Sequence, residues 1–192
     1  QAYNFRICLT DSVENQIPIT RPLGYDSTQF ELLLRYIEVK KPHELNWLLM
    51  HLQPMPHRKT DINNSGPFST DMIGESDDFA EASPEKRRHI FLKHQLYNQS
   101  FLYFLGHDPR VPIHLRKEML TYGYPKDEYV NHGNWSPQMY VREARRMIGE
   151  EVMTQAHCEG KILARKPIGM AAYTMDSHNC QRIVVKINGV DM

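Results

Sequence analysis

The sequence of 192 residues lacks several features that would each indicate a particular class of protein. It has only 3 cysteines, without CxxC spacing, which argues against a disulfide framework and against a thiolate zinc site. No apolar run approaches the length of a membrane span. The 23 basic and 23 acidic residues cancel, so no overall charge attracts nucleic acid or an anionic membrane. We therefore expect no nucleic-acid partner and no membrane span.

Short catalytic and cofactor motifs are also missing. The sequence contains no GxGxxG, GxxxxGK[ST], GxSxG or HExxH pattern. A metal-binding set can be assembled from His157, Cys158, His178 and Cys180, but adjacent ligands with this gap fit none of the common zinc spacings. The sequence thus predicts no metal site, and no means of holding a dinucleotide unaided.

The periodicities that are present predict an α+β fold: a helix-rich domain with a small, mostly antiparallel sheet formed by strands near the two termini. We expect residues 1–192 to form a single domain, because 41% hydrophobic residues in a chain of this length can build one core. Strands are expected at residues 3–9 and 182–187, paired through 183–187, and helices at 29–39, 42–52, 84–107 and 115–122. The longest predicted helix has Ser83 as N-cap, Pro84 at its first position and Asp108-Pro109 at its end. Its buried stripe is expected to contain Ile90, His94, Tyr97, Phe101 and Phe104.

Residues 54–82 show no sustained period and are rich in Pro, Asn, Asp, Ser and Gly, which predicts a long irregular polar loop. This loop carries Lys59, Asp61, Asn64 and Asp71, whose charged and amide groups suit binding of a hydroxylated ligand. The alternative is a run of turns in which Asn and Asp side chains bond their own backbone.

Residues 135–149 are predicted to form an amphipathic helix with one apolar and one basic side. The basic side carries Arg142, Arg145, Arg146 and Gly149. Like charges at i,i+4 and an interior glycine both destabilise a helix, so an anion bound on this side would explain the pattern. The alternative is a solvated surface in which Glu143 and Glu150 pair with the arginines.

A further candidate is His178, within Asp176-Ser177-His178-Asn179. Asp176 or Ser177 can orient its ring, and a histidine held in this way can act as a general acid or base. The alternative is a capped turn before the strand at 182–187.

Several of these stretches, in this order, resemble a family of bacterial FAD-dependent oxidoreductases, which are two-domain flavoproteins. The matching stretches are residues 1–6, 59–74, 102–105, 108–112, 134–149, 152–154 and 176–179. The chain departs from the family pattern at Ala171-Ala172-Tyr173, where Gly-Ser-Tyr is common, and at Ser136-Pro137, where Pro-Pro is common.

The resemblance implies that the chain is an internal part of a longer flavoprotein, on the substrate side of the cleft. It also implies that FAD binds in the full-length parent, that the remainder of the parent chain is the partner, and that the isolated chain binds no FAD and is inactive. The implied reaction transfers a hydride from a small hydroxylated, sugar-like substrate to flavin, with His178 as the proton acceptor. The substrate would contact Lys59, Asp61, Asn64, Asp71 and Arg142, and the cofactor would contact Arg145, Arg146 and Gly149.

Two other functions also agree with the residues. In a uronate-specific polysaccharide lyase, Tyr140 or His178 would abstract a proton while asparagine or arginine neutralises the carboxylate. In a non-catalytic glycan-binding domain, Trp47, Trp135 and the tyrosines would contact the ligand.

Overall fold

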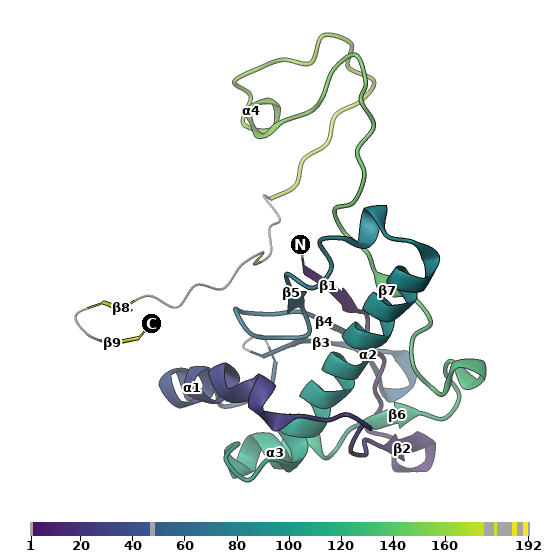
Figure 1. The fold of residues 1–192 in the computed structure, drawn as a ribbon, viewed down its shortest axis with the longest axis vertical. Coiled ribbons are helices and arrows are strands. Elements are labelled where there is room, and N and C mark those ends of the chain that lie inside the picture. The colour runs from purple at the N-terminus through teal and green to yellow at the C-terminus, as the bar shows by residue number, and fades with distance from the viewer. Residues whose placement is uncertain (1, 47–48, 175–178, 180–185, 188–189, 192) are drawn as a thin grey trace.

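The computed structural model describes residues 2–46, 49–174, 179, 186–187 and 190–191 and mixes helices with short antiparallel strands (Figure 1). The helices in this part of the chain are α1 Glu31–Lys40, α2 Pro84–His107, α3 Ile113–Met119 and α4 Gln155–Cys158. The strands are β1 Ala2–Phe5, β2 Gln16–Pro18, β3 His51–Met55, β4 Lys59–Asn63, β5 Met72–Ile73, β6 Gly123–Pro125, β7 Met139–Tyr140, β8 Lys186–Ile187 and β9 Val190–Asp191. The predicted α+β class is confirmed.

The helix α2 forms the centre of the core, as its sequence predicts (Figure 1). The hydroxyl of Ser83 accepts a hydrogen bond from the Lys86 amide, and all five residues of the predicted stripe are buried. Phe30, which ends the turn before α1, packs its ring against three aromatic rings of α2, with the Phe104 centroid 4.9 Å away. These contacts fix α1 and α2 against each other.

A three-stranded sheet has the order β5-β1-β7, with β1 antiparallel to both neighbours. The rings of Tyr3 and Phe5 point toward the side of α2, because they contact Phe79 and Phe91 at centroid distances of 5.7 and 5.1 Å. Side chains alternate along a strand, so Asn4 points to the other face. The sheet therefore has one aromatic face on α2 and one face with a polar residue in its middle.

The described residues between 42 and 63 fold differently from the sequence prediction. The predicted helix over 42–52 is absent from the described part of this segment, and β3 instead pairs with β4 in a hairpin from His51↔Asn63 to Met55↔Lys59. The expected irregular loop 54–82 thus contains β4 and β5. The reason is long-range pairing: Ile62 is fully buried and exchanges two backbone hydrogen bonds with Ile7.

The predicted helix over residues 135–149 is also wrong. Met139–Tyr140 forms β7, and residues 141–154 contain no helix. The backbone of Tyr140 lies opposite Asn4, and the Tyr3 hydroxyl donates to the carbonyl of Glu143 at 2.5 Å. A helix here would already be weakened by repulsion between the arginines and by the interior Gly149. The contacts with β1 stabilise the strand more than that helix would be stabilised. The expected apolar stripe is exposed in part, with Ile148 97% accessible.

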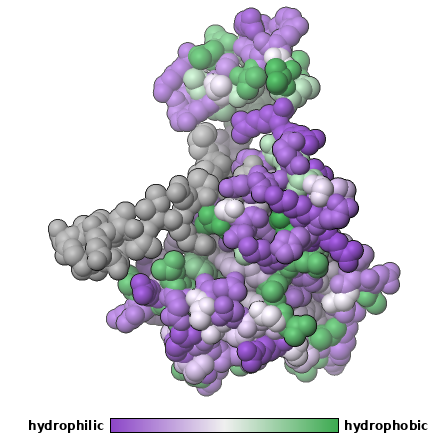
Figure 2. All heavy atoms as spheres, in the orientation of Figure 1, coloured by the Kyte–Doolittle hydropathy of each residue, from purple (hydrophilic) through white to green (hydrophobic). Residues whose placement is uncertain are grey.

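The C-terminal strands pair differently from the expectation. β1 has β5 and β7 as neighbours, and β8 pairs with β9, whereas residues 183–185 lie outside the described residues. Residues 141–174 leave β7 as an extended arm that carries α4 (Figure 1), and hydrophobic side chains lie among hydrophilic ones on its surface (Figure 2). No helix in the described part of the chain is long and apolar enough to cross a membrane.

Candidate functional site

The strand β4 places polar side chains on one side. Lys59, Asp61 and Asn63 are half-buried, and they alternate with the buried Thr60 and Ile62. Because side chains two residues apart share a face of a strand, these three polar groups point the same way. Three of the positions in the predicted polar loop are thus held on a rigid element.

At the start of β4, Lys59 is held by two carboxylates. Its ammonium donates to Asp127 Oδ2 at 2.9 Å and also to Glu128, and only 13% of the side chain is exposed. The hydrogen bonds to Glu128 and Asp127 raise the pKa of Lys59, so the side chain stays charged. The Asn134 amide donates to three backbone carbonyls of residues 125–128 and so fixes the loop that presents both carboxylates.

In the middle of β4, Asp61 forms a two-pronged ion pair with Arg6. The Arg6 Nε atom donates to Asp61 Oδ1 at 2.8 Å, and its Nη2 atom contacts Oδ2. The guanidinium carbon of Arg6 also lies 5.9 Å from the centroid of the Tyr140 ring. The charges of Arg6 and Asp61 therefore cancel each other.

At the end of β4, Arg142 is surrounded by oxygen atoms. Its Nη2 atom donates to Asn64 Oδ1 at 2.7 Å and to Asn63 Oδ1 at 3.3 Å, and it lies 3.8 Å from Asp71 Oδ1. The guanidinium carbon is 4.5 Å from the centroid of the Tyr140 ring, which is a cation–π distance. Tyr140 thus joins the two arginine groups. The structure brings together three predicted substrate residues here, Asn64, Asp71 and Arg142.

Asn4 belongs to the same cluster, although the sequence analysis did not select it. It is fully buried, and its Nδ2 atom donates to Asn63 Oδ1 at 3.1 Å and to Thr70 Oγ1 at 3.3 Å. Asn4 Oδ1 and Arg142 Nε are buried without a hydrogen-bond partner in the part of the chain that the structure describes. The sequence did contain one indication of this role, because Asn4 is a carboxamide between two aromatic residues of an apolar strand. One acceptor and one donor are thus unused inside the cluster.

The loop over residues 64–71 is anchored at several points. The Phe68 ring packs near Phe30 at a centroid distance of 6.3 Å, and the Tyr97 hydroxyl donates to the Ser69 carbonyl at 2.8 Å. Asn179 Nδ2 donates to the Gly66 carbonyl at 3.1 Å, which connects the loop to the predicted histidine motif. His178 lies outside the described residues.

The predicted cofactor residues do not join this cluster. Arg145 forms a two-pronged ion pair with Glu81 on the surface, with side-chain exposures of 66% and 77%. Arg146 and Gly149 are exposed. Without the predicted helix, the arginines no longer share a face, and only Arg142 turns toward β4.

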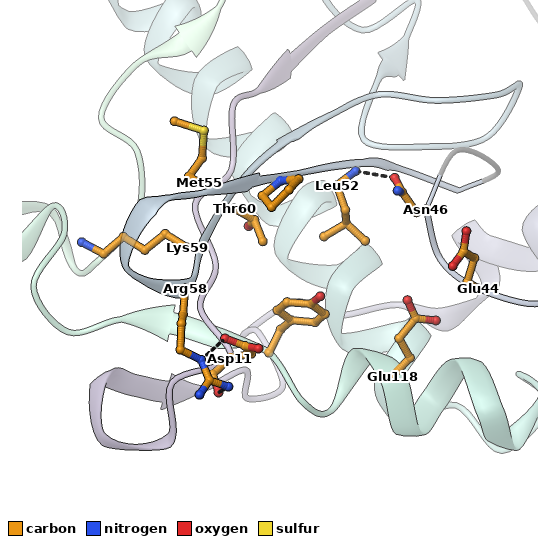
Figure 3. Close-up of a pocket in the computed structure, with 11 residues that line it drawn as sticks. Asp11, Glu44, Asn46, Leu52, Met55, Arg58, Lys59, Thr60 and Glu118 are labelled. Atoms are coloured by element: carbon orange, nitrogen blue, oxygen red, sulfur yellow. Dashed lines mark hydrogen bonds and ion pairs between the residues drawn. The ribbon is translucent and has the colours of Figure 1, made fainter.

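Two pockets lie on either side of the β3–β4 hairpin. One has a volume of about 310 Å³ and is bordered by α3, and of the predicted site residues that the structure describes only Lys59 lines it. Figure 3 shows the Asp11–Arg58 pair on one side and Glu118 on the other, while Lys59 extends away from Glu118. Burial raises the pKa of Glu118, against the opposing hydrogen bond from the Leu45 amide.

The second pocket has a volume of about 320 Å³ and is lined by both Lys59 and Asp61. Arg6, Cys8, Glu128 and Tyr129 also line it. The predicted substrate residues therefore divide between this pocket and the Arg142 cluster, and Tyr140 lies between Arg6 and Arg142.

The comparison with protein families agrees with the resemblance seen in the sequence. The family model for FAD dependent oxidoreductase matches residues 1–191. The chain belongs to this family. As a member of the FAD-dependent oxidoreductase family, it is assigned to a group of flavin enzymes, and FAD is the cofactor that the family uses. No curated protein and no solved structure matches the chain.

Proposed function

We propose that this chain forms the substrate-side wall of a FAD-dependent oxidoreductase that oxidises a small hydroxylated molecule. The observation that carries the proposal is the Arg142 cluster. Its guanidinium is positioned by Asn63 and Asn64, and its Nε atom has no hydrogen-bond partner within the described residues. A buried donor without a partner is unfavourable, and an oxygen of a substrate or a carbonyl of a flavin ring that entered the cluster would satisfy it.

The residues of this chain suit contacts with the flavin ring of FAD better than contacts with its pyrophosphate. The sequence has no glycine-rich loop for the pyrophosphate, which supports a separate segment of the protein as the holder of the dinucleotide. Arg142 would serve the flavin ring or the substrate. Arg145, Arg146 and Gly149 stay proposed as cofactor-side residues, and Arg145 would then exchange Glu81 for a cofactor group. FAD, when bound, supplies the acceptor for a hydride from the substrate carbon.

The chain's own contribution would be proton removal and orientation. Oxidation of an alcohol to a carbonyl releases a hydride from carbon and a proton from oxygen, and neutral His178 would accept that proton. The Asn179 bond to Gly66 supports a position for this motif beside the loop that carries Asn64 and Asp71. Lys59 and Asp61 would bind the substrate's other hydroxyls from β4.

Arg142→Ala tests the proposal in the full-length protein that contains this chain, purified with its flavin. The substitution removes the guanidinium that would donate to a substrate or flavin oxygen. Such a charge-assisted hydrogen bond is worth about 1.5–3 kcal/mol, so flavin reduction by substrate should slow at least about tenfold. Arg165→Ala is the matched control, because it removes an exposed arginine with no proposed role from the same 141–174 arm. Stopped-flow absorbance under anaerobic conditions measures both rates. Equal rates for the two variants would contradict the proposal.

His178→Ala tests the proton acceptor separately. Flavin content should stay unchanged while the reduction step slows, because the variant removes only the base. Unchanged reduction kinetics would exclude this role.

Titration of the chain alone with FAD tests the division of labour. We expect no tight binding, because the pyrophosphate has no glycine-rich loop here. Stoichiometric retention of FAD by the isolated chain would show that the chain holds the dinucleotide itself.

A further inference from the structure

The pocket beside β4 that Lys59 and Asp61 line has a size suited to one small ligand. Its volume of about 320 Å³ is near the lower limit of typical small-molecule sites. β4 forms one wall, the residues after β1 form another, and the loop at residues 128–129 forms a third. We call this space the β4 pocket.

The charges that line the β4 pocket occur in ion pairs. Arg6 pairs with Asp61, and Lys59 pairs with Glu128 and also with Asp127, which lies just outside the lining. This cluster therefore carries one more negative than positive charge. A carboxylate ligand would meet that excess and would have to break an ion pair to reach a cation, which is unfavourable in a partly buried site. The pocket therefore disfavours a carboxylate group.

Paired charges still have capacity for hydroxyl groups. A carboxylate has about four lone-pair positions and a guanidinium has five N–H donors, so the Arg6–Asp61 pair keeps unused acceptors and donors. A hydroxyl both donates and accepts, and it can bond both members of such a pair without separating them. Neighbouring hydroxyls on a ring can use both pairs together.

The rim of the β4 pocket adopts an unusual backbone conformation. His57 and Tyr129 both line it, and both have positive φ angles, 61° and 50°. Residues with side chains rarely adopt this region, and such positions occur preferentially at ligand sites. The Tyr129 carbonyl accepts hydrogen bonds from the amides of His132 and Asn134 at 2.7 and 3.1 Å, which hold the conformation. Tyr129 is 37% exposed, so part of it is accessible to a ligand.

We infer that the β4 pocket binds a neutral polyhydroxylated ring, such as a hexose, and discriminates against the corresponding uronate. The inference rests on the proposed function, because this ring would be the substrate or the part of the substrate that the chain recognises. It names the substrate class that the Arg142 cluster leaves open, and it argues against a uronate.

Binding to the 192-residue chain can be measured without flavin. The ¹⁵N-labelled chain is titrated with glucose, galactose and mannose, then with their uronates. We expect at least one neutral hexose to shift the amide signals of Cys8, Thr60 and Tyr129, and to bind more tightly than its uronate. The inference is overturned if no neutral hexose shifts these signals, or if the uronate binds as tightly.

Asp61→Asn provides a directional test. It leaves Arg6 without its partner, and one uncompensated charge near the ligand should raise the ratio of uronate to hexose affinity about tenfold. Arg6 is 40% exposed in its side chain, so water can solvate it and the chain should stay folded. Glu81→Gln is the matched control, because it removes the partner of Arg145 on the surface. An unchanged ratio in Asp61→Asn would contradict the role of paired charges.

The two proposals can fail separately. Hexose binding in the β4 pocket of a protein that shows no flavin reduction would support the pocket and contradict the oxidoreductase wall. Normal flavin reduction with no hexose-induced shift of the Cys8, Thr60 and Tyr129 signals would support the oxidoreductase wall and contradict hexose binding in the β4 pocket.

Discussion

Replacement of Phe30 by alanine should weaken both the core and the loop that carries part of the site. Phe30 is fully buried, and its ring contacts the aromatic rings of Phe68, Tyr97, Phe101 and Phe104 at centroid distances of 4.9 to 6.3 Å. A buried phenylalanine replaced by alanine costs about 3–5 kcal/mol, from lost burial and the remaining cavity. With this many ring contacts, we expect a value near the upper end.

The assay is urea unfolding followed by circular dichroism, with hydrogen exchange of the loop. Phe30→Ala should lower the free energy of unfolding by about 4–5 kcal/mol, and should speed amide exchange in residues 64–71 because Phe68 loses one of its supports. Leu23→Ala is the control, since Leu23 is 99% exposed and should change stability by less than about 0.5 kcal/mol. A loss below about 1 kcal/mol for Phe30→Ala would refute the packing described above.

Two further substitutions test other parts of the fold. Gly123→Ala should destabilise the β2–β6 pair by at least about 1 kcal/mol, because a Cβ atom there would lie 2.5 Å from the Ile17 carbonyl oxygen, and unchanged urea unfolding would disprove this close approach. Burial lowers the pKa of His94 below its usual 6.5, so the unfolded chain binds this proton more readily than the folded one. The free energy of unfolding should therefore have its full contribution from neutral His94 above about pH 6.5. That contribution should decrease as the pH falls toward the pKa of His94 in the folded chain. His94→Gln should reduce this loss between pH 7.5 and 5 in urea unfolding, and an equal loss in both proteins would exclude His94 as its source.

Some of the candidate site could be predicted from local sequence, and some could not. Lys59, Asp61, Asn64, Asp71 and Arg142 were selected as polar residues in suggestive positions. The structure places the first four along β4 or the loop after it, and it places Arg142, which follows β7, in contact with that loop. Their division between the β4 pocket and the Arg142 cluster was not predictable. It depends on contacts between residues 55 to 79 positions apart in the chain, such as Arg6 with Asp61 and Arg142 with Asn63.

Local sequence was sufficient for α2. Its start, its end and its buried stripe all depend on neighbouring residues: a serine cap, Pro84, an aspartate at the end and apolar side chains at helical spacing. The tertiary structure decided the segment around Arg142. There, Met139–Tyr140 pairs with β1, which lies more than 130 residues earlier, and this pairing replaces the helix that the local periodicity favours. It also placed Asn4 in the cluster, because a buried carboxamide acquires its role only from partners that the fold brings to it.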